Sequence, residues 1–403
     1  MTARPLPHRS HRLTEEKENH LMESAEFASI LDAVRAFVDK EVVPAEDEIE
    51  ETDQIPERIR TAAARMGLFG YALPEEHGGL GLTMSEEVQL AMVIGRTTPS
   101  FRSMFGTNNG IAGQVLVNFG TPEQQAKYLP GLAAGELIAS FALTEPDAGS
   151  DPSGLRTKAV KDGDDYLISG QKRFITNAPE ADVFMVFART GDVSEGTKGI
   201  SVFAVESALD GVTVGPADAK MGQRGAHTAE VFFDQVRVSR DALIGGVEGE
   251  GFTAAMRSLA KGRLHIAALC VGLAERLVDE SLAHATTQTQ GGSPIAEFQL
   301  VQAMLADSRT EAYAGRAMVV EAARTYDDGS DMRLAPSAAK LFCTEMVDRV
   351  ADRAVQIHGG LGYMQEVKVS RFYRDARLFR LYEGTSEVQR TIIAKQMVRG
   401  ARR

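Results

Sequence analysis

Apolar residues recur at intervals of three and four over the first third of the chain, as the buried face of a helix requires. One segment places six apolar side chains on a single face: Phe27, Ile30, Leu31, Val34, Phe37 and Val38. Further along, Thr121 precedes Pro122 and Gln124, which predicts a helix with a threonine cap, a proline in its first turn and a closed capping box. We therefore expect a helical domain over residues 23–137, preceded by an extended, disordered leader over residues 1–22.

The pattern changes near residue 138, where short segments rich in β-branched and aromatic residues alternate with turn residues. These segments are Tyr166–Ile168, Val183–Phe187, Ile200–Val205 and Val231–Val238. They predict a middle β-domain over residues 138–247, built as a barrel or a sandwich. No predicted strand leads into a G-x-G-x-x-G run, and the glycines at 78–81 and 245–246 are typical of turns. A doubly wound dinucleotide fold is therefore not expected.

Helical periodicity returns after residue 251 and persists. Phe298, Val301 and Leu305 mark one face of a helix for which Ser293 and Pro294 are the expected cap. The helices in this part are long, about 25 residues or more, which is typical of a bundle. The expected fold class is therefore α+β with mostly helix, and it ends in a helical bundle over residues 248–403.

Charge and composition narrow the classes of partner. The chain has 403 residues and a formal net charge of −12, which disfavours nucleic acid and anionic membranes because both need a basic face. No run of about 18 apolar residues could span a membrane. Cys270 and Cys343 lie apart in apolar contexts, so we expect buried thiols, and the histidines form no metal set. The leader lacks the hydrophobic run of a secretory signal and turns acidic at Glu15, unlike a transit peptide, which favours a cytoplasmic protein over one of the mitochondrial matrix.

Candidate chemistry lies in three places. Glu383 stands between an aromatic residue and a glycine, a setting in which a carboxylate could act as a general base. The turn at residues 144–151 offers hydroxyls and backbone N–H groups that could cradle a pyrophosphate, although an ordinary polar loop has the same composition. Phe174 and Thr176 would point to one side of a strand. An aromatic face beside a hydroxyl suits a flat heteroaromatic ring such as a flavin, and a plain half-buried strand is the alternative.

Five segments follow one another in a recognisable order. They read TEPDAGSD at 144–151, FITN at 174–177, MGQRGAHT at 221–228, QIHGGLGY at 356–363 and YEGT at 382–385. Together they resemble the signatures of the acyl-CoA dehydrogenase family, and the resemblance extends from about residue 24 to residue 399. It implies an N-terminal helical domain, a middle β-domain and a C-terminal four-helix bundle. It also implies FAD as cofactor and a homotetramer, a dimer of dimers, in which each FAD touches a neighbouring subunit.

The resemblance implies a role for particular residues in holding FAD. The residues expected around its flavin ring and pyrophosphate are Phe141, Leu143, Thr144, Gly149, Ser150, Phe174 and Thr176. Thr144 would bond the pyrimidine edge of the ring, and Thr176 would bond flavin N5. The residues expected to border FAD or to reach the FAD of a partner subunit are Gln288, Gln356, Gly359, Gly360, Thr385 and Glu387.

The family reaction follows from the same resemblance. A carboxylate, here Glu383, would remove the α-proton of an acyl-CoA thioester while the β-hydrogen leaves as a hydride to flavin N5. The product would be a trans-2-enoyl-CoA, and electron-transfer flavoprotein would take the electrons. The Glu383 backbone N–H and a flavin ribityl hydroxyl would hold the thioester carbonyl. Some relatives carry the base just before the Arg263 position, where this chain has Gly262, so Glu383 has no rival there. The expected substrate contacts are Ser150, Arg263, Tyr382 and Gly384.

Two departures from the family pattern bear on function. Where relatives carry an arginine and a phenylalanine against a neighbour's FAD, this chain has Gln288 and Gly291, which predicts weaker FAD binding. Arg102 could pair with the distal carboxylate of a dicarboxylic thioester such as glutaryl-CoA. The alternative for Arg102 is a solvated side chain at a helix start, with unbranched or short branched acyl groups as substrates.

Other functions stay open at this point. An acyl-CoA oxidase or a flavin monooxygenase could use the same fold, with reduced flavin meeting oxygen. A scaffold or assembly protein could also have kept the fold, although the retained Glu383, Thr176 and 144–150 turn argue against it. The length and branching of the acyl chain depend on the shape of the acyl cavity, which no motif reports. The pathway, fatty-acid β-oxidation or amino-acid catabolism, is equally open.

Overall fold

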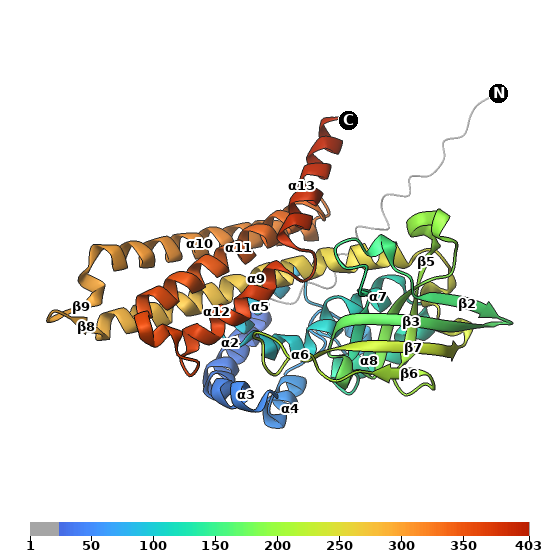
Figure 1. Cartoon of the computed structure of the whole chain (residues 1–403), viewed down its shortest axis with the longest axis horizontal. Coiled ribbons are helices and arrows are strands. Elements are labelled where there is room, and N and C mark those ends of the chain that lie inside the picture. Colours follow the sequence, from blue (N-terminus) through green and yellow to red (C-terminus); the bar gives the residue numbers. More distant parts are fainter. Residues whose placement is uncertain (1–23, 403) are drawn as a thin grey trace.

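The chain forms helices, then a β-sheet, then long helices, in the order that the sequence predicts (Figure 1). The computed structural model describes residues 24–402, and the leader predicted over residues 1–22 lies outside them. Figure 1 shows the sheet and the far end of the long helices at opposite ends of the molecule, with the helices of residues 24–65 beneath their junction. The predicted fold class is confirmed.

The N-terminal part is built from helices. They are α2 (Ser24–Phe37), α3 (Glu46–Thr52), α4 (Glu57–Arg65), α5 (Met84–Ile94), α6 (Pro99–Asn109), α7 (Ala112–Phe119) and α8 (Pro122–Ala134). The predicted face of α2 is confirmed, because Phe27, Val34 and the following Val38 are buried in the core. The predicted capping box is also confirmed: Thr121 accepts from the Gln124 backbone N–H, and the Gln124 side chain accepts from the Thr121 N–H.

A seven-stranded sheet forms the middle part. Its strands are β1 (Ala139–Ala142), β2 (Lys158–Asp162), β3 (Asp165–Thr176), β4 (Val183–Arg189), β5 (Ile200–Glu206), β6 (Val212–Val214) and β7 (Thr228–Val238). The order is β1-β4-β2-β3-β7-β6, with β5 paired to β4. Strand β4 is buried on both faces: Met185 and Phe187 pack toward the helices, while Phe184 and Val186 pack into the opposite core. This position explains why β4 reads as one continuous apolar run.

The C-terminal part is a bundle of long helices. They are α9 (Gly251–Thr287), α10 (Gln299–Asp327), α11 (Leu334–His358), α12 (Lys368–Ala376) and α13 (Ser386–Ala401). Helix α9 joins the parts, because its first turns pack on the sheet and its remainder packs in the bundle (Figure 1). Cys270 and Cys343 are buried and free, as predicted. None of the described helices combines the length and the apolar character needed to cross a bilayer.

The link between α9 and α10 corrects one prediction. Ser293 and Pro294 do not cap α10, which begins at Gln299 after a short 3-10 turn. They form strand β9 (Ser293–Pro294), which pairs with β8 (Thr289–Gln290). The cause is the glycine pair between the strands: Gly291 and Gly292 have φ of 61° and 90°, and two left-handed residues make a tight hairpin turn.

The segment at 221–228 docks the sheet against the bundle. The Gln223 backbone N–H donates to the carboxylate of Asp375 on α12, and the Gln223 side-chain amide donates to the Asp375 carbonyl at 3.2 Å. Gly222 permits this approach, because a Cβ there would lie 2.7 Å from Asp375 Oδ1. Asp375 is almost fully buried, and this burial raises the pKa of its carboxyl to about 7.

We predict that Asp375 makes stability depend on pH. Its folded pKa of about 7 lies above the ordinary value of 3.8, so its contribution is fully present below pH 3.8 and is lost as pH rises through 7. Asp375→Asn keeps an acceptor for Gln223 but does not titrate. Urea unfolding of both proteins between pH 4 and 8 should show the variant gaining stability relative to wild type as pH rises. A difference that stays constant over this range would contradict the prediction.

Candidate active site

Twelve of the predicted site residues line one cavity of about 980 Å³ between the sheet, α6, α9 and the segment before α13. Its walls come from segments far apart in the sequence, so only folding brings them together. The predicted residues that line it are Arg102, Phe141, Leu143, Thr144, Gly149, Ser150, Phe174, Thr176, Arg263, Tyr382, Glu383 and Gly384.

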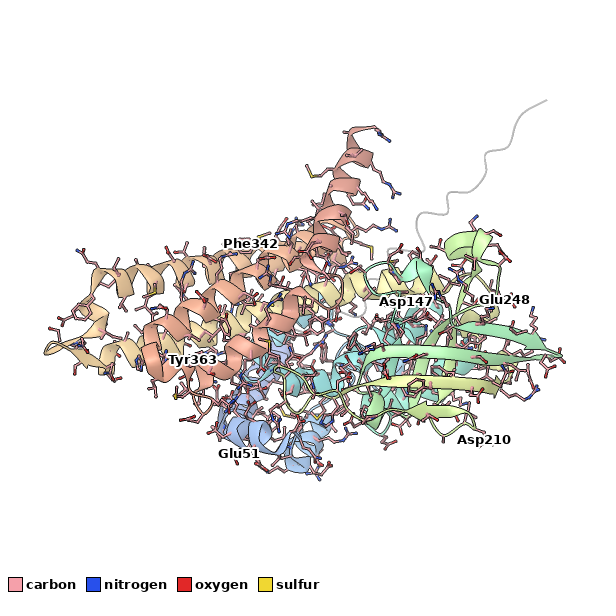
Figure 2. The ribbon with its side chains drawn as sticks, in the orientation of Figure 1. Glu51, Asp147, Asp210, Glu248, Phe342 and Tyr363 are labelled. Atoms are coloured by element: carbon pink, nitrogen blue, oxygen red, sulfur yellow. The ribbon has the colours of Figure 1, made fainter. Side chains whose placement is uncertain are left out.

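A second group of predicted residues lies elsewhere. His284, one turn before Gln288, stacks on His358 with ring centroids 4.1 Å apart. This contact places Gln288 near the end of α11, together with the exposed Gln356, Gly359 and Gly360. Tyr363 marks this end of the bundle, away from the sheet (Figure 2). These residues do not line the cavity of their own chain, and they are open to a neighbouring molecule.

Thr385 and Glu387 lie beside the cavity without lining it. The Thr385 hydroxyl caps α13 by accepting from the Val388 backbone N–H. Glu387 is exposed in the first turn of that helix, where a carboxylate is favourable to the helix dipole. Both residues therefore have a local structural role in starting α13.

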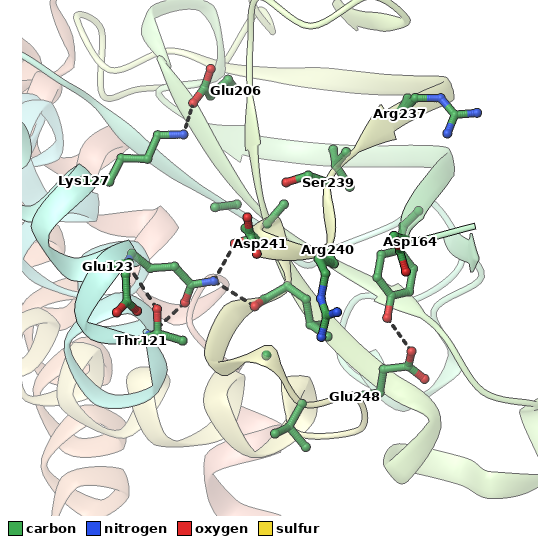
Figure 3. A pocket seen from close by; sticks show the side chains of 18 of the residues that line it. Thr121, Glu123, Lys127, Asp164, Glu206, Arg237, Ser239, Arg240, Asp241 and Glu248 are labelled. Atoms are coloured by element: carbon green, nitrogen blue, oxygen red, sulfur yellow. Dashed lines mark hydrogen bonds and ion pairs between the residues drawn. The ribbon is translucent and has the colours of Figure 1, made fainter. Parts of the chain in front are cut away.

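A larger, polar cavity of about 1130 Å³ lies between α8 and the outer side of the sheet (Figure 3). Some of its polar groups pair with one another: Lys127 Nζ lies 2.8 Å from Glu206, and the Tyr166 hydroxyl donates to Glu248 at 2.5 Å. Among its lining residues, all within the described chain, no buried side-chain polar atom lacks a partner. The first cavity differs, because it contains buried polar atoms without partners, and it is the candidate active site.

Glu383 is the unpartnered carboxylate of this site. Its Oε2 is buried and has no hydrogen-bond partner among the described residues. A Cβ at Gly262 would overlap this oxygen and lie 3.0 Å from Glu383 Cδ. The glycine therefore makes room for the carboxylate, and a side chain at position 262 and Glu383 in its present position exclude each other.

Two arginines approach the same space from different helices. Arg263 on α9 is buried, which lowers the pKa of its guanidinium, while the nearby Glu383 acts in the opposite direction. Arg102 on α6 is only 7% exposed, and its Nε has no partner among residues 24–402. Gly106 gives it room, because a Cβ there would lie 2.7 Å from Arg102 Nε. The interpretation of Arg102 as a solvated side chain is therefore wrong: the first turns of α6 are buried, which periodicity did not indicate.

Thr144, Gly149 and Ser150 of the turn at 144–150 line the cavity. Glu145 and Ala148 exchange two backbone hydrogen bonds of 3.1 Å, which close the turn and leave Gly149 and Ser150 exposed beyond it. A Cβ at Gly149 would meet nothing closer than a Thr144 methyl group at 4.0 Å. Exposed backbone N–H groups in such a turn suit a pyrophosphate.

Lys172, which sequence reasoning missed, supports this turn from inside the sheet. Its Nζ is fully buried and donates to the Leu143 carbonyl at 3.2 Å, to Glu145 Oε1 at 2.8 Å and to the Phe187 carbonyl at 2.7 Å. Burial lowers the pKa of Lys172 to about 8, and the Glu145 carboxylate opposes this shift. No local pattern distinguishes Lys172 from its half-exposed neighbour Arg173, so only the fold reveals its role.

Phe174 reaches the cavity for a different reason from the predicted one. Strand β3 has a bulge between Lys172 and Ile175, and Phe174 has a left-handed φ of 57°, so simple alternation does not place it beside Thr176. Its ring is 58% exposed, with the Arg173 guanidinium 4.8 Å above it. An exposed aromatic face, the Thr176 hydroxyl and the open 144–150 turn border one cavity, and these groups fit a flavin nucleotide. Among residues 24–402, no group of three metal-ligating side chains is assembled.

Comparison with known proteins gives the family context. Three family profiles match in order: "Acyl-CoA dehydrogenase, N-terminal domain" over residues 24–136, the middle domain over 140–236 and the C-terminal domain over 249–398. The chain is 39% identical to an acyl-CoA dehydrogenase of Bacillus subtilis, over 91% of this chain and 96% of the relative.

Two further relatives agree with this result. The chain is 38% identical to a subunit of the caffeyl-CoA reductase-Etf complex of Acetobacterium woodii, over 91% of this chain and 96% of that protein. The crystal structure of acyl-CoA dehydrogenase from Geobacillus kaustophilus superposes with a TM-score of 0.88 at 36% identity, covering 94% of this chain and 99% of that one. The chain thus belongs to the acyl-CoA dehydrogenase family of oxidoreductases.

Proposed function

We propose that this protein is an FAD-dependent acyl-CoA dehydrogenase that converts an acyl-CoA thioester to a trans-2-enoyl-CoA, with Glu383 as the base. The observation that carries the proposal is the buried, unpartnered Glu383 Oε2 in a cavity that also holds the open 144–150 turn. A carboxylate without a hydrogen-bond donor keeps its lone pairs available for a proton.

The residues that line the cavity have different proposed roles, according to where they lie. Phe141, Leu143 and Thr144 form the wall on which a flavin ring would rest, and Gly149 and Ser150 would hold its pyrophosphate by backbone N–H groups. Glu383 lines the same cavity and would take the α-proton of the thioester. Arg263 lines the same cavity, and the nearby Glu383 raises the pKa of its guanidinium against the effect of burial. Bound FAD would supply the oxidising power, accepting the β-hydrogen with its electron pair.

The residues at the far end of the bundle support a proposal about assembly. Gln288, Gln356, Gly359 and Gly360 are exposed and remote from the cavity of their own chain, so they would serve the FAD of a neighbouring subunit in a homotetramer. Gln288 carries no charge and Gly291 no side chain, so we propose a weaker hold on that FAD than an arginine and a phenylalanine would give.

The electron acceptor and the compartment are further parts of the proposal. Electron-transfer flavoprotein is the proposed acceptor, supported by the relative named as a subunit of a complex with Etf. The cytoplasm is the proposed location, supported by the bacterial relative that matches almost throughout. Slow reoxidation of the reduced protein in air would support a dehydrogenase, and rapid reoxidation would favour an oxidase.

The burial of Arg102 favours a second candidate class of substrate, dicarboxylic thioesters such as glutaryl-CoA. Its guanidinium lines the same cavity as Glu383 and has an unpartnered Nε. A buried cation of this kind is costly unless an anion pairs with it. A distal carboxylate on the acyl group would supply that anion.

We predict that Glu383→Gln abolishes reduction of the bound flavin by acyl-CoA. The amide keeps the size of the side chain but cannot accept a proton at neutral pH, so the rate should fall at least about 100-fold. Anaerobic stopped-flow absorbance at the flavin maximum, with acyl-CoAs of several chain lengths, measures this rate. If the variant bleaches as fast as wild type, Glu383 is not the base.

We predict that Gly262→Ala also slows flavin reduction, because its Cβ would displace the Glu383 carboxylate. A displacement of about 1 Å at a reacting group costs up to about 100-fold in rate. The same stopped-flow assay measures the effect. Gly400→Ala is the matched control, since a Cβ there meets nothing within 4 Å, and it should keep the wild-type rate. Equal rates for both variants would contradict the prediction.

We predict that Arg102→Met lowers kcat/KM for glutaryl-CoA about 10- to 100-fold, because that ratio corresponds to the free energy of one hydrogen bond to a charged group. Turnover of butyryl-CoA, which has no distal carboxylate, should be unchanged. Steady-state assays with both substrates and an artificial electron acceptor measure the ratio. If wild type turns over butyryl-CoA and not glutaryl-CoA, the dicarboxylic class is wrong.

A further inference from the structure

The backbone at the proposed base is strained. Glu383 has a left-handed φ of 52° and Gly384 a φ of 92°. A residue with a side chain keeps a left-handed conformation only where its surroundings hold it there. Gly384 is needed for a related reason, because a Cβ there would lie 2.7 Å from Gln389 Nε2. Something must therefore hold this turn, and the groups that do so set the direction of the Glu383 carboxylate.

Two buried side chains from different helices hold the turn by its carbonyl groups. Lys340 on α11 is 0% exposed, and its Nζ donates to the Gly384 carbonyl at 2.8 Å. Gln389 on α13 is also fully buried, and its Nε2 donates to the Gly384 carbonyl at 2.9 Å and to the Glu383 carbonyl at 3.3 Å. The carbonyl groups of Glu383 and Gly384 thus both accept hydrogen bonds from buried side chains.

We propose that Lys340 is the positioning residue for the base: it anchors the Gly384 carbonyl and thereby fixes the Glu383 carboxylate in the cavity. The inference rests on the proposed function, because it concerns the same carboxylate. Lys340 lines no part of the cavity and has no direct contact with a substrate there. It acts through the backbone of the turn, so its effect should fall on the chemical step rather than on acyl-CoA binding.

The charges around Lys340 agree with this role. Burial lowers the pKa of Lys340 to about 8, and the Glu383 carboxylate opposes that shift, so the ammonium persists at neutral pH. The groups that face it from the packed elements are Glu383, Arg263, Cys270 and Glu345. A fully buried ammonium is costly unless it is paired. A lysine whose sole task was to fill the core would be better replaced by an apolar side chain.

The test uses Lys340→Met, which keeps the length of the side chain and removes its donor. Anaerobic stopped-flow measures flavin reduction per bound flavin at several acyl-CoA concentrations. We expect the limiting rate to fall about 100-fold, as for a base displaced by about 1 Å, with half-saturation within about twofold of wild type. A purely structural role would lower thermal stability and the folded yield but leave the rate per bound flavin unchanged.

Lys172→Met is the matched comparison, because it also removes a buried lysine that donates to carbonyl groups. Lys172 supports the 144–150 turn, so this variant should lose flavin during gel filtration. Lys340→Met should show the opposite pattern, full flavin content with slow reduction. The two patterns separate cofactor binding from positioning of the base.

The possible failures can be told apart. If no acyl-CoA reduces the wild-type flavin, the proposed function is wrong, and the inference falls with it. If wild type is reduced, Glu383→Gln is not, and Lys340→Met is reduced as fast as wild type, the inference alone is overturned. Should Lys340→Met fail to fold, Lys340→Gln is an uncharged and shorter side chain that should also lose the contact to the Gly384 carbonyl. It should give the same loss in limiting rate, and a wild-type rate there would overturn the inference.

Discussion

The centre of this molecule is arranged around one carboxylate, Glu383, because burying its oxygen costs free energy that neighbouring groups must offset. Glu383 Oε2 has no partner among the described residues, and an unpaired charge in a protein interior is unfavourable unless nearby charges offset it. Arg263 on α9 and Lys340 on α11 supply positive charge beside it, and Gly262 supplies the space. Gly262 and Arg263 come from α9 and Lys340 comes from α11, so the carboxylate is tenable only when α9, α11 and the segment before α13 pack as they do. Formation of the site and packing of the bundle are in this sense one event.

On both sides of the cavity, a buried lysine donates hydrogen bonds to an irregular backbone segment. On the sheet side, Lys172 is buried beneath the 144–150 turn and donates to backbone carbonyls and to Glu145. On the bundle side, Lys340 is buried beneath the Glu383 turn and donates to Gly384. In both places an irregular backbone, which has few hydrogen bonds of its own, is held by a cation that water cannot reach. Rigid turns on both walls leave the cavity itself free for ligands.

Local chemistry explains what could be predicted from the sequence. Helical periodicity located α2, the capping box located the start of α8, and turn residues separated the strands, because each feature depends on neighbours within about four residues. The failures have non-local causes. The bulge at Phe174 arises from pairing with β7, and Arg102 is buried because other helices cover α6. Lys172 and Lys340 look like ordinary lysines in the sequence. Their partners lie 15 to 44 residues away along the chain, beyond the reach of any short pattern.

The hairpin between α9 and α10 shows how a glycine can favour local structure while leaving little side-chain surface on the outside of the molecule. Gly291 adopts a φ of 61°, a conformation that glycine reaches without strain and phenylalanine does not. The tight turn is therefore favourable for this chain on its own. The same glycine offers no aromatic surface beyond the molecule, and the exposed Gln288 beside it offers no charge. The cavity is held by buried contacts within one chain, whereas the exposed residues at this end of the bundle do not line it, so their side chains can vary without disturbing the cavity.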